Sequence, residues 1–291
     1  MKVRIAVGLG GGGVDADTFT TVVSALGPLG FDSLWISEVL TGPGPDPLIA
    51  LAVAAGLNPK LKLGTTLLLP GRNELRLAKA LASLDVLTRG RLLLTFVPGL
   101  TRGPERDAIG VAVADRAAAI ERTLPRLRRW WAGEEVDGVT VAPRPIQDPV
   151  EIWLGGLAQP SLVRCGRLAD GWLGAFCTPA QAAEAKTTID DAAASAGREV
   201  DPEHFGLSIA YSHEPLDDGQ LAGLAARNRG VDPRTLFPVG YPALRELLQS
   251  YIDVGMSKFV LRPPAPVRPD DPTAWQDELA GLAAAVTDLQ T

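Results

Sequence analysis

The chain has 291 residues, close to the size of a (β/α)₈ barrel, for which about 250 residues is typical. Apolar residues make up 46% and charged residues 21%, so a large core is possible and global disorder is excluded. The net charge is −6 with no block of Lys or Arg, which argues against a nucleic-acid partner, since phosphate binding needs a basic face. Neither a membrane-spanning run nor a signal peptide is visible, so a cytoplasmic location is expected.

Short apolar runs typical of buried strands alternate with amphipathic helical stretches along the chain. The predicted strands are residues 4–7, 31–37, 61–69, 91–97, 151–154, 171–176, 205–211 and 258–261. The predicted helices are residues 15–29, 47–56, 74–87, 114–131, 160–169, 179–196, 216–229, 242–254 and 273–289. Eight strand-and-helix units predict a parallel sheet closed into one TIM-barrel domain over residues 1–291. Residues 134–148, after the fourth main helix, are expected to form a short hairpin insertion with its turn at Asp137-Gly138.

Residues 8–13 also satisfy the pattern G-x-G-x-x-G between a strand and a helix, and Glu38 ends the second strand. A dinucleotide-binding fold is therefore an alternative. It is disfavoured because Asp15 and Asp17 stand where a pyrophosphate would lie, and because the strand-and-helix alternation continues past residue 150.

In a parallel barrel the chemistry lies at the C-terminal ends of the strands. Gly155-Gly156, before the helix at residue 160, could present amides to an anion, although tight turns alone also explain such glycines. Glu38 is either a catalytic carboxylate or the salt-bridge partner of an arginine such as Arg72 or Arg262. His213 follows the seventh strand and is placed near the barrel mouth. Two histidines and two distant cysteines do not predict a metal site.

Several stretches of sequence resemble one known family of barrels. They include residues 29–38 (LGFDSLWISE), 84–92 (LDVLTRGRL), 152–156 (IWLGG), 167–172 (RLADGW) and 259–263 (FVLRP). Together they resemble the luciferase-like monooxygenase superfamily, and within it the deazaflavin (coenzyme F420)-dependent oxidoreductases of bacteria. The resemblance implies a flavin or deazaflavin in the C-terminal mouth of the barrel.

The resemblance also implies roles for individual residues. The cofactor ring would lie against Thr66 and Leu67, where family members often carry a non-proline cis peptide. The cofactor phosphate would lie on Gly99 and on the turn of Gly155, Gly156, Leu157 and Ser161. Glu38 is the first candidate for proton transfer, and His213 is the second.

The sequence departs from the family at two places. Val39 stands where many deazaflavin-dependent members have a histidine, and residues 95–99 read TFVPG where the family often has G-x-G-x-G. Phe96 and Pro98 are therefore expected to crowd the place where a ring would approach.

The leading hypothesis is hydride transfer between coenzyme F420 and a small organic substrate. An FMN-dependent monooxygenase on the same fold is the first alternative. A non-catalytic barrel with weakened cofactor binding is the second, motivated by Val39 and Phe96. The resemblance further implies a possible homodimer. An apolar substrate is favoured because Leu69, Leu100, Leu157 and Phe176 are expected to line the mouth.

Overall fold

A computed structural model describes residues 1–9, 13–103, 105–226, 228, 230–264 and 270–291. Eight parallel strands close into a barrel in the order in which they occur along the chain. The strands are β1 (Arg4–Leu9), β2 (Ser33–Ser37), β3 (Lys62–Leu68), β4 (Leu92–Val97), β5 (Ile152–Gly155), β6 (Gly171–Ala175), β7 (Phe205–Ala210) and β8 (Lys258–Arg262). The predicted (β/α)₈ TIM barrel is therefore confirmed, and β8 pairs with β1 to complete it. Residues 10–12, which belong to the stretch that matches G-x-G-x-x-G, lie outside the described residues.

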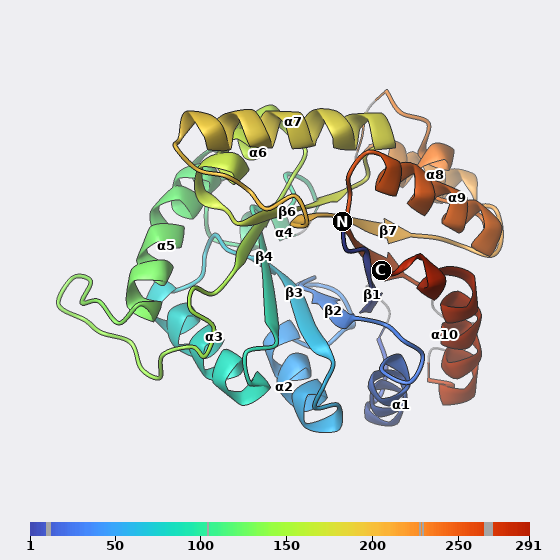
Figure 1. The fold of residues 1–291 in the computed structure, drawn as a ribbon, viewed down its shortest axis with the longest axis horizontal. Helices are drawn as coiled ribbons and strands as arrows, with labels where there is room; N and C mark the ends of the chain where they lie inside the picture. Colours follow the sequence, from blue (N-terminus) through green and yellow to red (C-terminus); the bar gives the residue numbers. More distant parts are fainter. Residues whose placement is uncertain (10–12, 104, 227, 229, 265–269) are drawn as a thin grey trace.

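Helices form a ring around the strands, and both chain termini lie near the middle of the view in Figure 1. The helices are α1 (Ala16–Leu26), α2 (Pro47–Leu57), α3 (Glu74–Thr88), α4 (Glu105–Ala108), α5 (Arg116–Trp131), α6 (Gln159–Leu168), α7 (Pro179–Ser195), α8 (Asp218–Ala225), α9 (Gly240–Asp253) and α10 (Pro272–Val286). Short 3₁₀ turns are η1 (Val113–Asp115), η2 (Pro233–Thr235) and η3 (Thr287–Leu289). None of the helices in the described ranges is long and apolar enough to cross a membrane.

Local side chains define where the helices begin. The Asp15 carboxylate accepts a hydrogen bond from the Thr18 amide at 2.7 Å, and Asn73 accepts from the Arg76 amide at 3.0 Å. Such caps satisfy amides that have no partner inside the helix. α7 begins with a full capping box between Thr178 and the third helical residue.

The apolar core has two layers because successive strand residues point to opposite faces. The outer layer packs strands against helices, and it includes Leu67, Phe96 and Phe259. The inner layer fills the barrel with Ala6, Trp35, Trp153, Leu173 and Val260. A Cβ on Gly64 would lie 2.0 Å from the Trp35 ring, so the missing side chain is what lets that indole lie across β3.

The predicted hairpin at residues 134–148 is only partly correct. A single antiparallel bridge joins Val136 and Val139 around a turn in which Asp137 (φ 52°) and Gly138 (φ 76°) are left-handed. No strand ladder extends from this bridge within the described residues. The prolines at 143, 145 and 149 cannot donate ladder hydrogen bonds, which explains why the pairing stops.

Candidate active site at the C-terminal ends of the strands

β4 and β5 are neighbours, and their C-terminal ends bring the predicted phosphate-binding residues together. Phe96 pairs with Leu154 in register, so the segment through Gly99 leaves the barrel beside Gly155 and Gly156. A Cβ on Gly155 would lie 2.7 Å from Cγ1 of Val97. The glycine at 155 therefore permits the two strand ends to approach closely.

The start of α6 carries a run of backbone donors without protein acceptors. Ala158 caps the helix and provides no side-chain hydrogen bond. Within the described part of the chain, no carbonyl accepts from the amides of residues 156–159, nor from the amides of Gly99 and Leu100. Gly156 has φ +120°, and its carbonyl accepts from Nε1 of Trp172 at 2.9 Å, which fixes the turn. Unpaired amides at a helix N-terminus are suited to bind an anionic group.

The predicted ring-binding residues lie on β3 but face in opposite directions. Thr66 points into the barrel, where its Oγ1 accepts from Nε1 of Trp35 at 3.0 Å. Leu67 packs in the outer layer, so only its backbone could meet a cofactor. The peptide bonds that are cis in the described residues precede Pro143 and Pro149, so the Thr66–Leu67 bond is trans. The register of β3 with β2 and β4 is continuous through this position.

The expected crowding of the mouth by Phe96 is wrong. Phe96 is fully buried in the outer layer, because β4 turns its even-numbered residues toward the helices. Thr95 points into the barrel instead, and among the described residues its buried Oγ1 has no hydrogen-bond partner. An orphaned buried hydroxyl is unusual in a folded protein. It leaves a polar contact available inside the barrel below the strand ends.

Glu38 forms a salt bridge with Arg72, one of the two arginines expected as its partner. Its side chain is only 6% exposed, and one carboxylate oxygen contacts the Arg72 guanidinium. The other oxygen accepts from the Leu68 amide at 2.7 Å, while Nε of Arg72 donates to the Leu68 carbonyl at 3.0 Å. The pair therefore clamps the C-terminal end of β3, directly after Thr66 and Leu67. A catalytic role for Glu38 stays a prediction.

His213 follows β7 and contacts side chains of two outer helices. Its Nε2 lies 2.7 Å from the Glu278 carboxylate on α10, and its ring meets Tyr241 of α9 edge-on. Glu278 also accepts from the Tyr211 hydroxyl. Burial and the Glu278 carboxylate raise the pKa of Tyr211, so this phenol stays protonated. The position of His213 after the seventh strand was predicted correctly, but its partner lies 65 residues away in sequence.

The contacts of two strand-end residues were not predicted: Phe176 was expected only to line the mouth, and Arg262 only as an alternative partner of Glu38. Phe176, after β6, is left-handed with φ 57°, a conformation that costs an aromatic residue free energy. Its carbonyl accepts from Nδ2 of Asn228 at 2.7 Å. Arg262 ends β8, and its Nε donates to Ser208 Oγ at 2.9 Å. The side-chain alternation along β7 and β8 could have predicted that Ser208 and Arg262 both point into the barrel. The backbone strain has no sequence signal.

The apolar lining expected at the mouth is only partly correct. Leu69 is buried in the outer core, whereas Leu100 is 53% exposed. Leu157 is half-buried and packs against the outer core.

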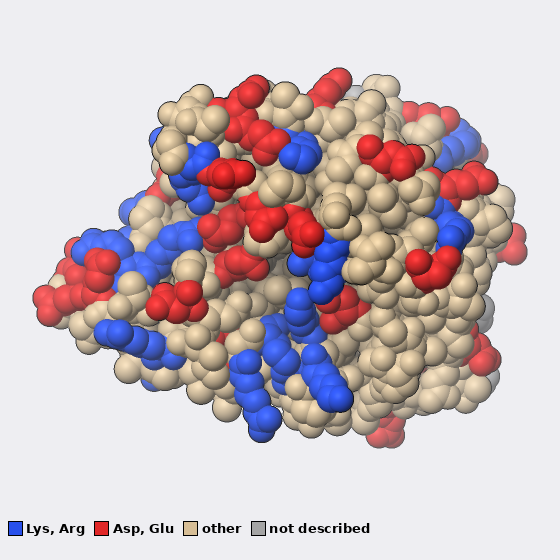
Figure 2. All heavy atoms as spheres, in the orientation of Figure 1, with Lys and Arg blue, Asp and Glu red and all other residues tan. Residues whose placement is uncertain are grey.

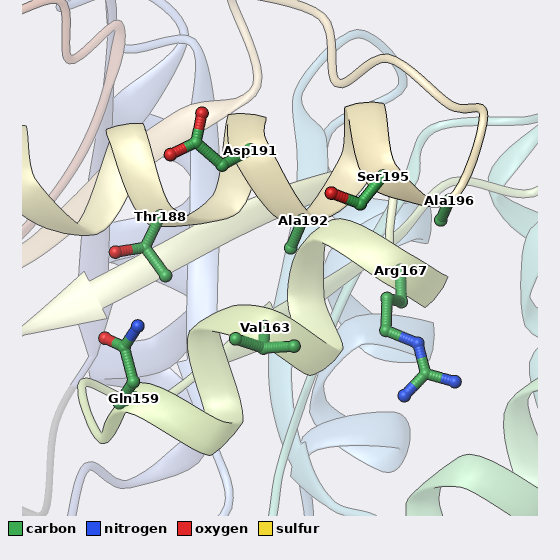
Figure 3. A pocket seen from close by; sticks show the side chains of 8 residues that line it. All are labelled: Gln159, Val163, Arg167, Thr188, Asp191, Ala192, Ser195 and Ala196. Carbon is green, nitrogen blue, oxygen red and sulfur yellow. The ribbon is translucent and has the colours of Figure 1, made fainter.

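A groove of about 650 Å³ lies outside the barrel, between α6 and α7 (Figure 3). Gln159, Val163 and Arg167 line it from α6, and α7 supplies the opposite wall. It runs along the helix ring rather than at the ends of the strands. Among the described residues, no three His, Cys, Asp or Glu side chains gather to hold a metal ion.

The fold agrees with a comparison against known protein families. Residues 1–218 match the family described as luciferase-like monooxygenase. Because the match covers most of the chain, this protein belongs to that family.

The chain is also similar to individual proteins of known sequence and structure. The chain is 28% identical over 169 residues to F420-dependent glucose-6-phosphate dehydrogenase of Nakamurella multipartita, covering 50% of this chain and 48% of that protein. The chain thus spans about half the length of the curated relatives it matches. Among solved structures, monooxygenase RslO1 of Streptomyces bottropensis superposes with a TM-score of 0.79 at 21% identity, covering 98% of this chain and 99% of that one. The oxygenating constituent of 3,6-diketocamphane monooxygenase of Pseudomonas putida, in complex with FMN, superposes with a TM-score of 0.76 at 18% identity, covering 100% and 99%.

Proposed function

We propose that this protein transfers a hydride between coenzyme F420 and a small organic substrate. The observation that carries the proposal is the run of amides at residues 156–159 that have no carbonyl partner among the described residues, together with those of Gly99 and Leu100, which follow the adjacent strand β4. Both cofactors under consideration carry a phosphate on a flexible chain, and such amides suit that group. The similarity to an F420-dependent dehydrogenase supports the deazaflavin.

Each part of the mouth would have a defined task when the cofactor is bound. Gly99, Gly155, Gly156, Leu157 and Ser161 would hold the phosphate. Thr66, the backbone of Leu67 and the free hydroxyl of Thr95 would face the ring. The cofactor supplies the hydride chemistry, and the barrel supplies orientation and exclusion of water.

Glu38 and Arg72 would keep the ring-facing end of β3 in place. Because both carboxylate oxygens already accept hydrogen bonds, we propose a positioning role for Glu38 ahead of proton transfer. Val39 is 46% exposed and cannot exchange a proton, so a substrate that needs one would obtain it from another group or from water. Homodimerisation and a cytoplasmic location remain predictions.

FMN-dependent oxygenation is the second candidate, supported by the fold shared with an FMN-containing monooxygenase. A non-catalytic barrel has less support than the sequence suggested, because Phe96 does not enter the mouth.

Titration of the purified protein with F420 and with FMN, followed by fluorescence quenching, tests these alternatives. We expect micromolar binding of F420 and weaker binding of FMN. Binding of FMN alone contradicts hydride transfer with F420, and binding of neither favours the non-catalytic barrel.

A further inference from the structure

Arg116, the first residue of α5, is a buried arginine whose guanidinium donates to backbone carbonyls. Its side chain is 2% exposed. Nε donates to the Val111 carbonyl at 3.2 Å, and Nη1 donates to Pro98 at 3.2 Å and Leu100 at 2.8 Å. Nη2 donates to the Arg106 carbonyl. The connection between β4 and α5 therefore folds around the guanidinium, which binds four of its carbonyls.

The Arg116 guanidinium forms no salt bridge with any described residue. Among the described residues, no carboxylate oxygen lies within 4.0 Å of its guanidinium. Another buried arginine, Arg164, is paired with Glu121 at 2.9 Å. Burial of an unpaired charge is costly, and carbonyl dipoles offset only part of that cost. A counter-charge supplied by a ligand would offset more of it.

Arg116 lies beside Gly99 and Leu100, whose amides would meet that ligand. Its Nη1 would be 3.2 Å from a Cβ on Gly99, which has φ +82°. The N-terminus of the 16-residue α5 starts at the same place, and its Asp115 cap makes no side-chain hydrogen bond. The helix dipole and the guanidinium thus add positive potential at one point of the barrel mouth.

We propose that Arg116 is a positioning residue for the phosphate of the cofactor. It holds the Pro98 and Leu100 carbonyls inward so that the neighbouring amides face the mouth, and its charge favours an anionic group there. This role rests on the proposed function, because the phosphate belongs to the flavin or deazaflavin.

A second arginine provides a matched control at the other end of β4. Arg91 also donates to carbonyls, those of Thr88 at 2.7 Å, Asn58 at 2.9 Å and Leu61. It precedes the first residue of β4, whereas the loop held by Arg116 follows the last. R91Q and R116Q remove the same charge and the same kind of carbonyl contact from opposite ends of the barrel.

The experiment compares each cofactor with its phosphate-free chromophore. Dissociation constants are measured for FMN and riboflavin, and for F420 and 8-hydroxy-5-deazariboflavin, with the native chain and both variants. We expect R116Q to weaken binding of the phosphate-bearing member of each pair roughly tenfold relative to its chromophore. R91Q should leave that ratio unchanged, although both variants lose thermal stability.

Three results would overturn the role of Arg116. One is equal weakening of both members of each pair in R116Q, which is the result of loop disorder alone. Another is the same change of ratio in R91Q. If R116Q does not fold, R116K is used instead, because it keeps the charge. R116K must keep the native preference for the phosphate-bearing cofactor over its chromophore, and a smaller preference contradicts the electrostatic part of the proposal.

Failure of the native chain to bind F420 and FMN would contradict the proposed function instead. Inorganic phosphate then serves as the probe, by calorimetry. It must bind the native chain more tightly than R116Q, and equal binding overturns the role of Arg116.

Discussion

The two ends of the barrel handle charge in different ways. At the N-terminal ends of the strands, Lys258 is buried against Asp32 and donates to Ser33 Oγ at 2.7 Å, and His204 contacts Glu151 at 2.7 Å. Figure 2 looks onto the side of the molecule where both termini lie, and it shows acidic and basic side chains gathered near the middle. A cavity of only about 20 Å³ remains between these charges and the inner tryptophans, room for about one water.

At the C-terminal ends, several polar groups lack such partners. Arg116 has no carboxylate beside it, Thr95 Oγ1 has no partner among the described residues, and the amides of residues 156–159 are unbonded. Phe176 is left-handed as well. Unsatisfied groups and backbone strain cost stability, so they are expected where a ligand completes the structure. We therefore expect substitutions at the N-terminal ends to affect stability, and substitutions at the C-terminal ends to affect ligand binding.

Substitution D32N should have the largest effect on stability. Burial raises the pKa of Asp32, but the charge and hydrogen bond of Lys258, together with Lys62 and Ser33, outweigh burial and hold that pKa below its ordinary value. Removing the carboxylate leaves Lys258 buried without its counter-charge, which we expect to lower the free energy of unfolding by about 3 kcal/mol. Urea denaturation of the native chain and the variant measures this change in the free energy of unfolding. D190N removes an exposed pair with Lys186 and should cost less than about 0.5 kcal/mol. Equal losses would contradict the expectation.

Substitution G64A tests the packing inside the barrel. Its Cβ would lie 2.0 Å from the Trp35 ring, so the indole must move and we expect a loss of about 2 kcal/mol. G56A in α2 meets nothing within 4 Å and should leave stability unchanged or raise it slightly. We expect G64A to change cofactor affinity little. A large loss of affinity without a loss of stability would contradict the division of roles between the two ends of the barrel.

Substitution G156A should act mainly on binding. Alanine is disfavoured at φ +120°, and its Cβ would lie 3.1 Å from Cβ of Ser161, so the amides of the turn must shift. We expect about tenfold weaker cofactor binding with a loss of stability near 1 kcal/mol. Fluorescence titration measures the affinity, and native-like affinity would show that this turn does not hold the phosphate.

Substitution E38Q distinguishes positioning from proton transfer. The amide oxygen of glutamine can still accept from the Leu68 amide, but the ion pair with Arg72 is lost. We expect cofactor binding to weaken a fewfold, with R72M giving the same change. A proton donor would instead leave binding intact and slow turnover roughly 10²- to 10⁴-fold.

The pH dependence of stability reports on His204 and should be the smallest effect. Burial lowers the pKa of His204, but the hydrogen bond and charge of Glu151 outweigh it and raise that pKa above the ordinary 6.5. The folded chain thus binds this proton more tightly than the unfolded chain. The stabilisation is complete below pH 6.5 and is lost as the pH rises through the raised value. Thermal unfolding across this range should show the decline, and H204N should abolish it.

Much of the fold could be predicted because its signals are local. Each of the eight strands lies within a few residues of its predicted position, because uniformly apolar runs and helix caps depend on neighbouring residues only. The connection between β4 and α5 was missed, where α4 and η1 form around Arg116. Carbonyls from four separate positions define that connection, and no sequence period predicts such a cluster.

The sequence by itself determined the eight alternating units, the glycines at the strand ends and the family to which the chain belongs. Only the tertiary structure decided that Phe96 faces the helices while Thr95 faces the barrel, because the pairing of β4 with both neighbours sets the direction of every side chain along it. It also decided that Glu38 pairs with Arg72, that His213 meets Glu278, and that Arg116 stays without a carboxylate. Those contacts depend on which loops and helices meet after the barrel closes.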